Sequence, residues 1–193
     1  MNDPAEHLAA VAIPPVPLSG GTSKTTVPVW DLVVRVGHWG LVAGFLVALL
    51  SEEGKNTHQI AGYTVAAIVV VRLAWGFIGP AHARFANFVP TPRHLFAHLA
   101  DVFHRREHRE LGHNPAAGAM VAALLGLMLL LGLTGFLLTT DGLRHSVFLA
   151  GLHGTAANVA LVLVVIHVAG AIYESVRFHE NLPWSMVTGR KRV

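Results

Sequence analysis

The sequence contains no cysteine, and this absence removes several kinds of functional site. Disulfide bonds, iron–sulfur clusters, thiolate zinc sites and the Cys-x-x-Cys-His attachment of c-type haem all need thiol groups. A metal ion or a haem iron would therefore have to be held by histidine, carboxylate or methionine. Histidine is abundant, with 13 copies in 193 residues.

Charged residues are also scarce. They make up 13% of the chain, whereas hydrophobic residues make up 53%, so most of the chain has no polar face to present to water. This composition indicates an integral membrane protein. The net charge of +3 does not indicate a nucleic-acid partner, because the basic residues are distributed as membrane proteins distribute them.

Four apolar segments are long enough to cross about 30 Å of hydrocarbon. They cover about residues 30–50, 58–78, 115–139 and 150–173. The first two and the last two are joined by short connections, so each pair should form an antiparallel hairpin. We predict an all-α integral membrane protein, an up-down-up-down bundle of four transmembrane helices in residues 29–193. Residues 1–28 are rich in Pro, Ala, Ser and Thr, and we expect a disordered tail there.

The longer connection between the second and third segments contains TPRHLFAHLADVFHRRE. Its apolar residues follow helical spacing, at Leu95, Phe96, Leu99, Val102 and Phe103. We expect an amphipathic helix on the cytoplasmic membrane surface, with a solvated loop helix as the alternative.

The basic residues predict the orientation. Those on one side are Arg84, Arg93, Arg105, Arg106, Arg109, Arg177, Arg190, Lys191 and Arg192. The two short loops on the other side carry Lys55 and Arg144. The positive-inside rule therefore places both termini in the cytoplasm.

Four histidines lie on the apolar segments: His38 in the first, His58 at the start of the second, and His153 and His167 in the fourth. Ionisable side chains inside a bilayer are costly and usually serve a function. For the histidines in tails and connections, including His113, we expect solvated or headgroup-level positions.

The four histidines form two pairs by depth. His153 and His167 are fourteen residues apart, which returns nearly to one helix face and spans about 21 Å. The first segment begins on the inner side, so His38 lies at the depth of His167. The second begins on the outer side, so His58 lies at the depth of His153. Two opposed imidazoles at each of two levels suit the axial ligation of two b-type haems.

Other residues fit around such cofactors. Gly62, four residues after His58, leaves room for a porphyrin, although small residues also serve close helix packing. Arg35 and Arg72 can each pair with a haem propionate, or with an anionic lipid headgroup.

These residues resemble the bacterial cytochrome b561 family, the di-haem four-helix type that includes the b-type subunits of nickel–iron hydrogenases. The matching motifs are VWDLVVRVGHWG, HQIAGYTVAAIVVVRLAWGFIGP and HGTAANVALVLVVIHVAG. Two further segments, HARFANFVPTP with LGHNPAAG and the ending HENLPWSMVTGRKR, are similar to a branch often associated with c-type cytochromes. The resemblance runs from about Val29 to the C-terminus. It implies that the four histidines ligate two non-covalent b haems.

The expected function is electron transfer across the membrane between the quinone pool (ubiquinone or ubiquinol) and an outer-face redox partner, such as a periplasmic c-type cytochrome. By analogy with the family, an alternative is a superoxide:quinone oxidoreductase, with Lys55 and Arg144 as the basic groups near the outer haem. That alternative would make the chain an enzyme in its own right. A third alternative is a membrane anchor whose haems have a purely structural role. A histidine-lined metal or proton transporter is remoter, because the acidic residues all lie at segment ends and in loops.

Overall fold

A computed structural model describes residues 26–106 and 108–192 of the chain. Within those residues, four helices are long and apolar enough to cross a membrane. They are α1 (Leu32–Leu50), α2 (Asn56–Ile78), α5 (Pro115–Leu138) and α6 (Val147–Arg177). The predicted all-α membrane fold with four spans is confirmed, and three of the helices lie within two residues of their predicted bounds.

Local capping explains where these helices begin. The Asp31 carboxylate accepts a hydrogen bond from the backbone N–H of Val34, and the Asn114 side chain accepts one from Ala117. Ser146 caps α6 in the same way, and the helix begins at Val147, three residues before the predicted start. With 31 residues, α6 is about 46 Å long, so it extends beyond a hydrocarbon layer of about 30 Å.

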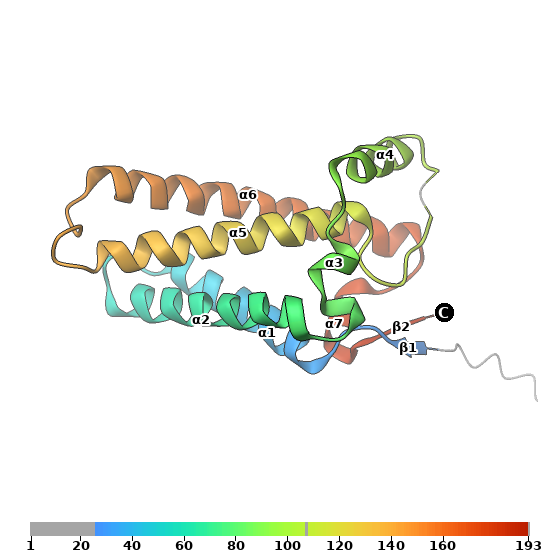
Figure 1. Cartoon of the computed structure of the whole chain (residues 1–193), viewed down its shortest axis with the longest axis horizontal. Helices are drawn as coiled ribbons and strands as arrows, with labels where there is room; N and C mark the ends of the chain where they lie inside the picture. The colour runs from blue at the N-terminus through green and yellow to red at the C-terminus, as the bar shows by residue number, and fades with distance from the viewer. Residues whose placement is uncertain (1–25, 107, 193) are drawn as a thin grey trace, which may run out of the picture.

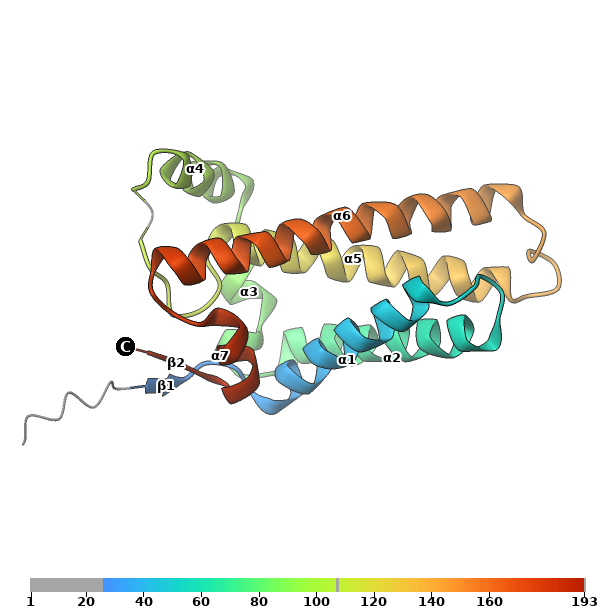
Figure 2. The ribbon, with the colours of Figure 1, turned by 180° about the vertical axis from the view of Figure 1, so that it is seen from behind.

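The long helices run in alternating directions (Figures 1 and 2). α1 packs on α2, α2 on α5, and α5 on α6, whereas the backbones of α1 and α6 hardly approach each other. The buried core lies where the packed helices meet and consists of Phe45, Val65, Val69, Leu125, Met128 and Ala160.

Small residues bring the packed helices close. A Cβ atom at Gly132 of α5 would lie 2.9 Å from the Cβ of Ala66 in α2. A Cβ at Gly44 of α1 would lie 2.7 Å from the side chain of Val65. Such contacts are typical of helices that associate within a membrane.

The short elements gather at one end of the bundle (Figure 1). They are β1 (Thr26–Pro28), the 3₁₀ turn Ala81–Ala83, α3 (Phe85–Phe88), α4 (Pro92–Phe103), α7 (Leu182–Thr188) and β2 (Arg190–Arg192). α4 occupies the segment where we predicted a helix, and its position on a membrane surface stays a prediction.

The strands β1 and β2 pair antiparallel, with Val27 opposite Lys191. The predicted tail 1–28 therefore needs a correction at its end, since its last three residues are held in β1 by the C-terminus. Residues 1–25 lie outside the described residues.

Candidate functional site

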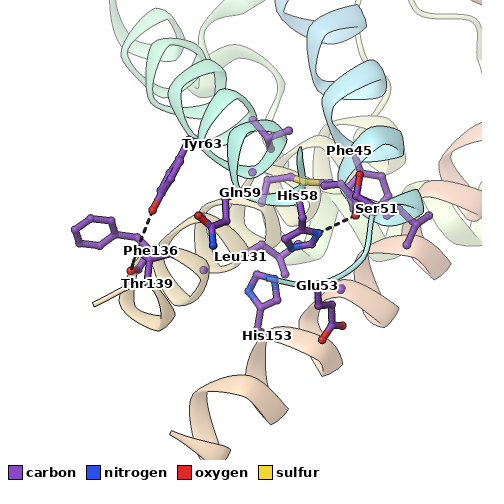
Figure 3. A pocket seen from close by; sticks show the side chains of 18 of the residues that line it. Phe45, Ser51, Glu53, His58, Gln59, Tyr63, Leu131, Phe136, Thr139 and His153 are labelled. Atoms are coloured by element: carbon purple, nitrogen blue, oxygen red, sulfur yellow. Dashed lines mark hydrogen bonds between the residues drawn. The ribbon is translucent and has the colours of Figure 1, made fainter. Parts of the chain in front are cut away.

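One pair of histidines lies near the end of the bundle that carries the two short turns. His58 stands in the first turn of α2 and His153 in the second turn of α6, and their ring centroids are 6.2 Å apart (Figure 3). The Nδ1 atom of His58 lies 2.9 Å from the carbonyl oxygen of Ala48. The Nδ1 atom of His153 lies 2.8 Å from the hydroxyl of Thr134 in α5.

These hydrogen bonds fix which ring nitrogen carries the proton. A carbonyl only accepts, so the His58 Nδ1–H donates to Ala48. The Thr134 hydroxyl lies 2.7 Å from the carbonyl oxygen of Leu130, to which it donates, so it accepts from the His153 Nδ1–H. Both Nε2 atoms keep a free lone pair, which is the state in which imidazole binds a metal.

The second pair lies toward the end with the short elements. His38 of α1 and His167 of α6 have ring centroids 6.3 Å apart. The indole ring of Trp39 stands edge-on to His38, with centroids 5.4 Å apart. The structure thus brings together His38 with His167 and His58 with His153, the two pairs that depth alone predicted.

The ring spacing is suited to one metal ion between each pair. A metal bonded to two opposed imidazole nitrogens at about 2 Å each separates the ring centroids by about 6 Å. Direct packing of the two rings would bring them closer. Among the described residues no group of three or more histidine or acidic side chains is arranged to hold a metal, so these paired sites are two-ligand sites.

The pair His58 and His153 borders a cavity of about 220 Å³. Gly62, Gly154 and Ala157 line it, and a Cβ atom at Gly62 or Gly154 would meet nothing within 4 Å. Gly62 therefore faces open space and does not serve close helix packing. A flat macrocycle placed between His58 and His153 would therefore not clash with residue 62.

Arg72 of α2 is buried, with 7% of its surface exposed. Its guanidinium carbon lies 5.1 Å from the ring centroid of Phe85 and 5.7 Å from that of Phe88. The Nη1 atom has no hydrogen-bond partner within the described chain. A buried cation with a free donor suits a carboxylate ligand.

Arg35 points elsewhere. Its Nη2 donates to the carbonyl of Val187 in α7, and its buried Nε atom lacks a hydrogen-bond partner among residues 26–106 and 108–192. The two arginines that the sequence singled out therefore lie in different surroundings.

His113 is the residue that the sequence reading misplaced. We expected a solvated or headgroup-level side chain, whereas its ring packs against Trp30 and Phe88 within the protein, with centroid distances of 4.7 and 4.6 Å. Burial, together with the positive charges of Arg72 and Lys191, lowers the pKa of His113 to about 3. Its position directly before Asn114, the cap of a membrane helix, is the one signal in the sequence that placed it at the bundle end.

At the end of the bundle with the two short turns, both basic residues are paired with acids. Lys55 lies 3.4 Å from the carboxylate of Glu52, and Arg144 forms an ion pair with Asp141. Glu53 adds a carboxylate at the edge of the cavity beside His58 and His153. This surface is not electropositive.

Comparison with known proteins gives one family. Residues 29–189 match the model of the family described as prokaryotic cytochrome b561. A probable Ni/Fe-hydrogenase B-type cytochrome subunit of Bradyrhizobium diazoefficiens is 24% identical over 241 residues, which covers 99% of this chain and 96% of the relative. Proteins of the same description from Rhizobium leguminosarum (24% identity, 87% of this chain, 90% of the relative) and Azotobacter vinelandii (26%, 86% and 88%) also match. No solved structure matches the chain.

Proposed function

The chain belongs to the prokaryotic cytochrome b561 family, a family of b-type cytochromes that transfer electrons in membranes, and from this premise we propose a di-haem electron carrier. The inner haem is held by His38 and His167, and the outer haem by His58 and His153. The observation that carries the proposal is the pair of ring spacings, 6.3 and 6.2 Å, at two levels of one helix.

The protein supplies ligation, orientation and a low dielectric for this chemistry. Each haem, when bound, provides an iron that gains and loses one electron. The four histidines would hold the irons through ring nitrogens, and for His58 and His153 this would be Nε2, because Ala48 and Thr134 hold the two rings by their Nδ1–H groups.

We assign the haem propionates on the inner side to Arg72, because its buried guanidinium has a free donor. Gly62 provides clearance at the outer level. Arg35, which we also considered for a propionate, donates to the Val187 carbonyl, so Arg72 is the better candidate of the two.

Electrons pass between the quinone pool and an acceptor or donor at the outer face. We propose a periplasmic c-type cytochrome as that partner and the bacterial inner membrane as the location, with both termini in the cytoplasm. The hydrogenase named in the relatives' descriptions is a second class of partner. The turn between α5 and α6 is short, so the outer face offers little surface for contact with a large hydrogenase subunit.

The superoxide alternative is less favoured. An anionic substrate needs an electropositive approach, whereas Lys55 and Arg144 are both neutralised by neighbouring carboxylates.

Haem content and its response to histidine replacement test the proposal. Purified protein should bind about two b haems per chain, seen as a pyridine haemochrome and a sharp reduced α-band. His167→Ala should remove the inner haem and leave the outer one, and His58→Ala should do the reverse. His94→Ala, an exposed histidine on α4, is the matched control and should keep both haems. A colourless wild-type preparation would overturn the proposal.

A further inference from the structure

The two histidine pairs differ in the charged groups that lie beside them. Glu53, in the turn between α1 and α2, lines the cavity beside His58 and His153, and its carboxylate interacts electrostatically with His153 (Figure 3). The basic residues at this end, Lys55 and Arg144, are paired with other acids. Glu53 itself forms no ion pair in the part of the chain that the structure describes, so no direct partner cancels its negative charge.

A positive charge lies at the level of the other pair. Arg72 stands fourteen residues after His58 on α2, just as His167 stands fourteen residues after His153 on α6. The ring centroids of His58 and His153 are 6.2 Å apart, so both counts start at one level. The two helices run in the same direction (Figure 1). Fourteen residues return nearly to the same helix face, and Arg72 therefore lies at the depth of His167.

The charge of Arg72 is held inside the protein. Arg72 is 7% exposed. Asp31 is an opposite charge that acts on it, but no ion pair joins the two within residues 26–106 and 108–192, and the Asp31 carboxylate accepts the indole N–H of Trp75 over 3.2 Å. The positive charge of Arg72 reaches His113, and His113 also interacts with His167. The inner pair therefore has a buried cation in its surroundings, whereas the outer pair has a carboxylate.

A nearby charge shifts a haem potential because the iron centre changes its own charge. Ferric iron in a porphyrin leaves one positive charge, and ferrous iron leaves none. A carboxylate therefore stabilises the ferric state and lowers the potential, whereas a guanidinium group raises it. The hydrogen bonds from the rings of His58 and His153 to Ala48 and Thr134 act in the same direction as Glu53, because they make the imidazoles more basic.

We propose that Glu53 and Arg72 set the two haem potentials apart, so that the haem between His38 and His167 holds an electron more tightly than the outer haem does. The inference rests on the proposed function and adds which haem is reduced first. In the favoured transfer the outer iron is oxidised from ferrous to ferric and the inner iron is reduced from ferric to ferrous. One electron moves, and no bond or proton is involved. A protein that holds one electron keeps its outer haem oxidised and open to the next electron.

A potentiometric titration of the detergent-purified holoprotein, followed at the reduced α-band, measures both midpoints. His167→Ala and His58→Ala each leave one haem and therefore assign the two steps. We expect an equilibrium constant of about ten or more for electron transfer from the outer to the inner haem, which is about 59 mV between the midpoints. A common midpoint, or a higher midpoint for the outer haem, would overturn the inference and leave the di-haem carrier standing. A preparation without two b haems would overturn the proposed function, and the inference with it.

Glu53→Gln removes the outer charge and keeps the size of the side chain. We expect the outer midpoint to rise and the equilibrium constant to fall by about threefold or more, with the inner midpoint unchanged. Glu52→Gln is the matched control, because Glu52 is paired with Lys55, has a side chain that is 79% exposed and does not line the cavity. An unchanged outer midpoint in Glu53→Gln, or an equal shift in both variants, would overturn the role of Glu53.

Arg72→Gln tests the inner charge. We expect the inner midpoint to fall, with the equilibrium constant again lowered by about threefold or more, while the outer midpoint stays as in wild type. Arg72→Lys keeps the charge and should keep the inner midpoint, and Arg93→Gln on exposed α4 should change neither. Equal inner midpoints in Arg72→Gln and Arg72→Lys would overturn the role of Arg72. If Arg72→Gln releases the inner haem, the order of the wild-type midpoints still decides the inference.

Discussion

Thr134 carries the hydroxyl group that orients His153. It is almost completely buried, at 2% exposure, and its oxygen lies 2.8 Å from the imidazole Nδ1. Hydrogen bonds of this kind hold a metal-ligating ring in place and raise its basicity. A more basic ligand stabilises the ferric form of a haem, so the hydroxyl should lower the potential of the outer haem.

Thr134→Val keeps the shape of the side chain and removes the acceptor. We expect the outer haem to bind about 10- to 100-fold more weakly and its midpoint potential to rise, with the inner haem unchanged. Haem content and a two-step redox titration measure both effects. Thr64→Val, which removes an exposed hydroxyl bonded to the Ile60 carbonyl, is the control. An equal effect of the two variants would show that the bond to His153 does not matter.

His113 should make the protein sensitive to acid. Its pKa is lowered from 6.5 to about 3 in the folded state, chiefly by burial. Below about pH 6.5 the unfolded chain binds a proton at this residue and the folded chain does not, so stability is lost as the pH falls toward 3. Above that window the residue is neutral in both states and has no effect.

The variant His113→Phe should remove this part of the pH dependence, which is at most about 1.4 kcal/mol per pH unit for one proton. Thermal unfolding of detergent-solubilised protein at pH 7 and pH 5 measures it, with His94→Phe on exposed α4 as control. If His113→Phe and wild type lose stability equally between these pH values, the neutral buried state is wrong.

At the scale of elements, the two strands and α7 tie α1 to α6 at one end of the bundle. Gly189, in the left-handed region with φ +78°, accepts hydrogen bonds from the backbone N–H groups of Val29 and Trp30. Buried Lys191 lies 3.4 and 3.3 Å from the carbonyl oxygens of Glu110 and Gly112. Since the backbones of α1 and α6 hardly approach each other, we expect this assembly to set the separation of His38 and His167.

Lys191→Ala should therefore weaken the inner site selectively. Loss of its bonds to two carbonyl groups should cost about 1–3 kcal/mol, and the inner haem should be released at lower temperature than the outer one. Difference spectra during heating measure the two losses. Lys55→Ala removes an exposed ion pair at the other end of the bundle and should leave both haems as in wild type. Simultaneous loss of both haems in Lys191→Ala would contradict a local role.

α4 carries two apolar stripes. Leu95 and Val102 are half-buried on the side that packs toward α5, whereas Phe96, Leu99 and Phe103 are 69%, 45% and 85% exposed. Arg93, Arg105 and Arg106 flank the exposed stripe. An exposed apolar stripe with basic neighbours fits an anionic membrane surface.

Spin labels can measure this contact cleanly, because the chain has no cysteine. In vesicles containing anionic lipid, a nitroxide at Phe96→Cys should be reached more readily by oxygen than by a water-soluble nickel complex. A nitroxide at Asp101→Cys, on the opposite side of α4, should show the reverse. If both positions favour the nickel complex, α4 is a solvated helix.

The sequence predicted those features that depend on residues close together in the chain, and it missed those that depend on residues far apart. The four spans follow from apolar length, and α5 begins at the predicted Asn114 cap because capping involves residues three apart. The histidine pairs follow from helix geometry and alternating direction. The pairing of β1 with β2 joins Thr26 to Arg192, so no local pattern reveals it. His113 was misread for the same reason, since its burial comes from Trp30 and Phe88.

At the scale of the whole molecule, the ends of the bundle differ in charge and in structure. All the short elements lie at one end, together with the loops that contain Arg84 and Arg109 and the C-terminal strand (Figure 1). The other end has two short turns, whose basic residues Lys55 and Arg144 are paired with acids. This asymmetry predicts that the first end remains in the cytoplasm.

Reporter fusions test the orientation of the full-length chain. Green fluorescent protein fused after Val193 should fluoresce, because it folds in the cytoplasm, and alkaline phosphatase at the same position should be inactive. Alkaline phosphatase inserted at Gly142, where a Cβ atom would meet nothing within 4 Å, should be active because the α5–α6 turn faces the periplasm. The reverse pattern would place the inner histidine pair at the periplasmic face. Quinol oxidation would then release its protons outside, and the c-type cytochrome could not reach the haem that we have called outer.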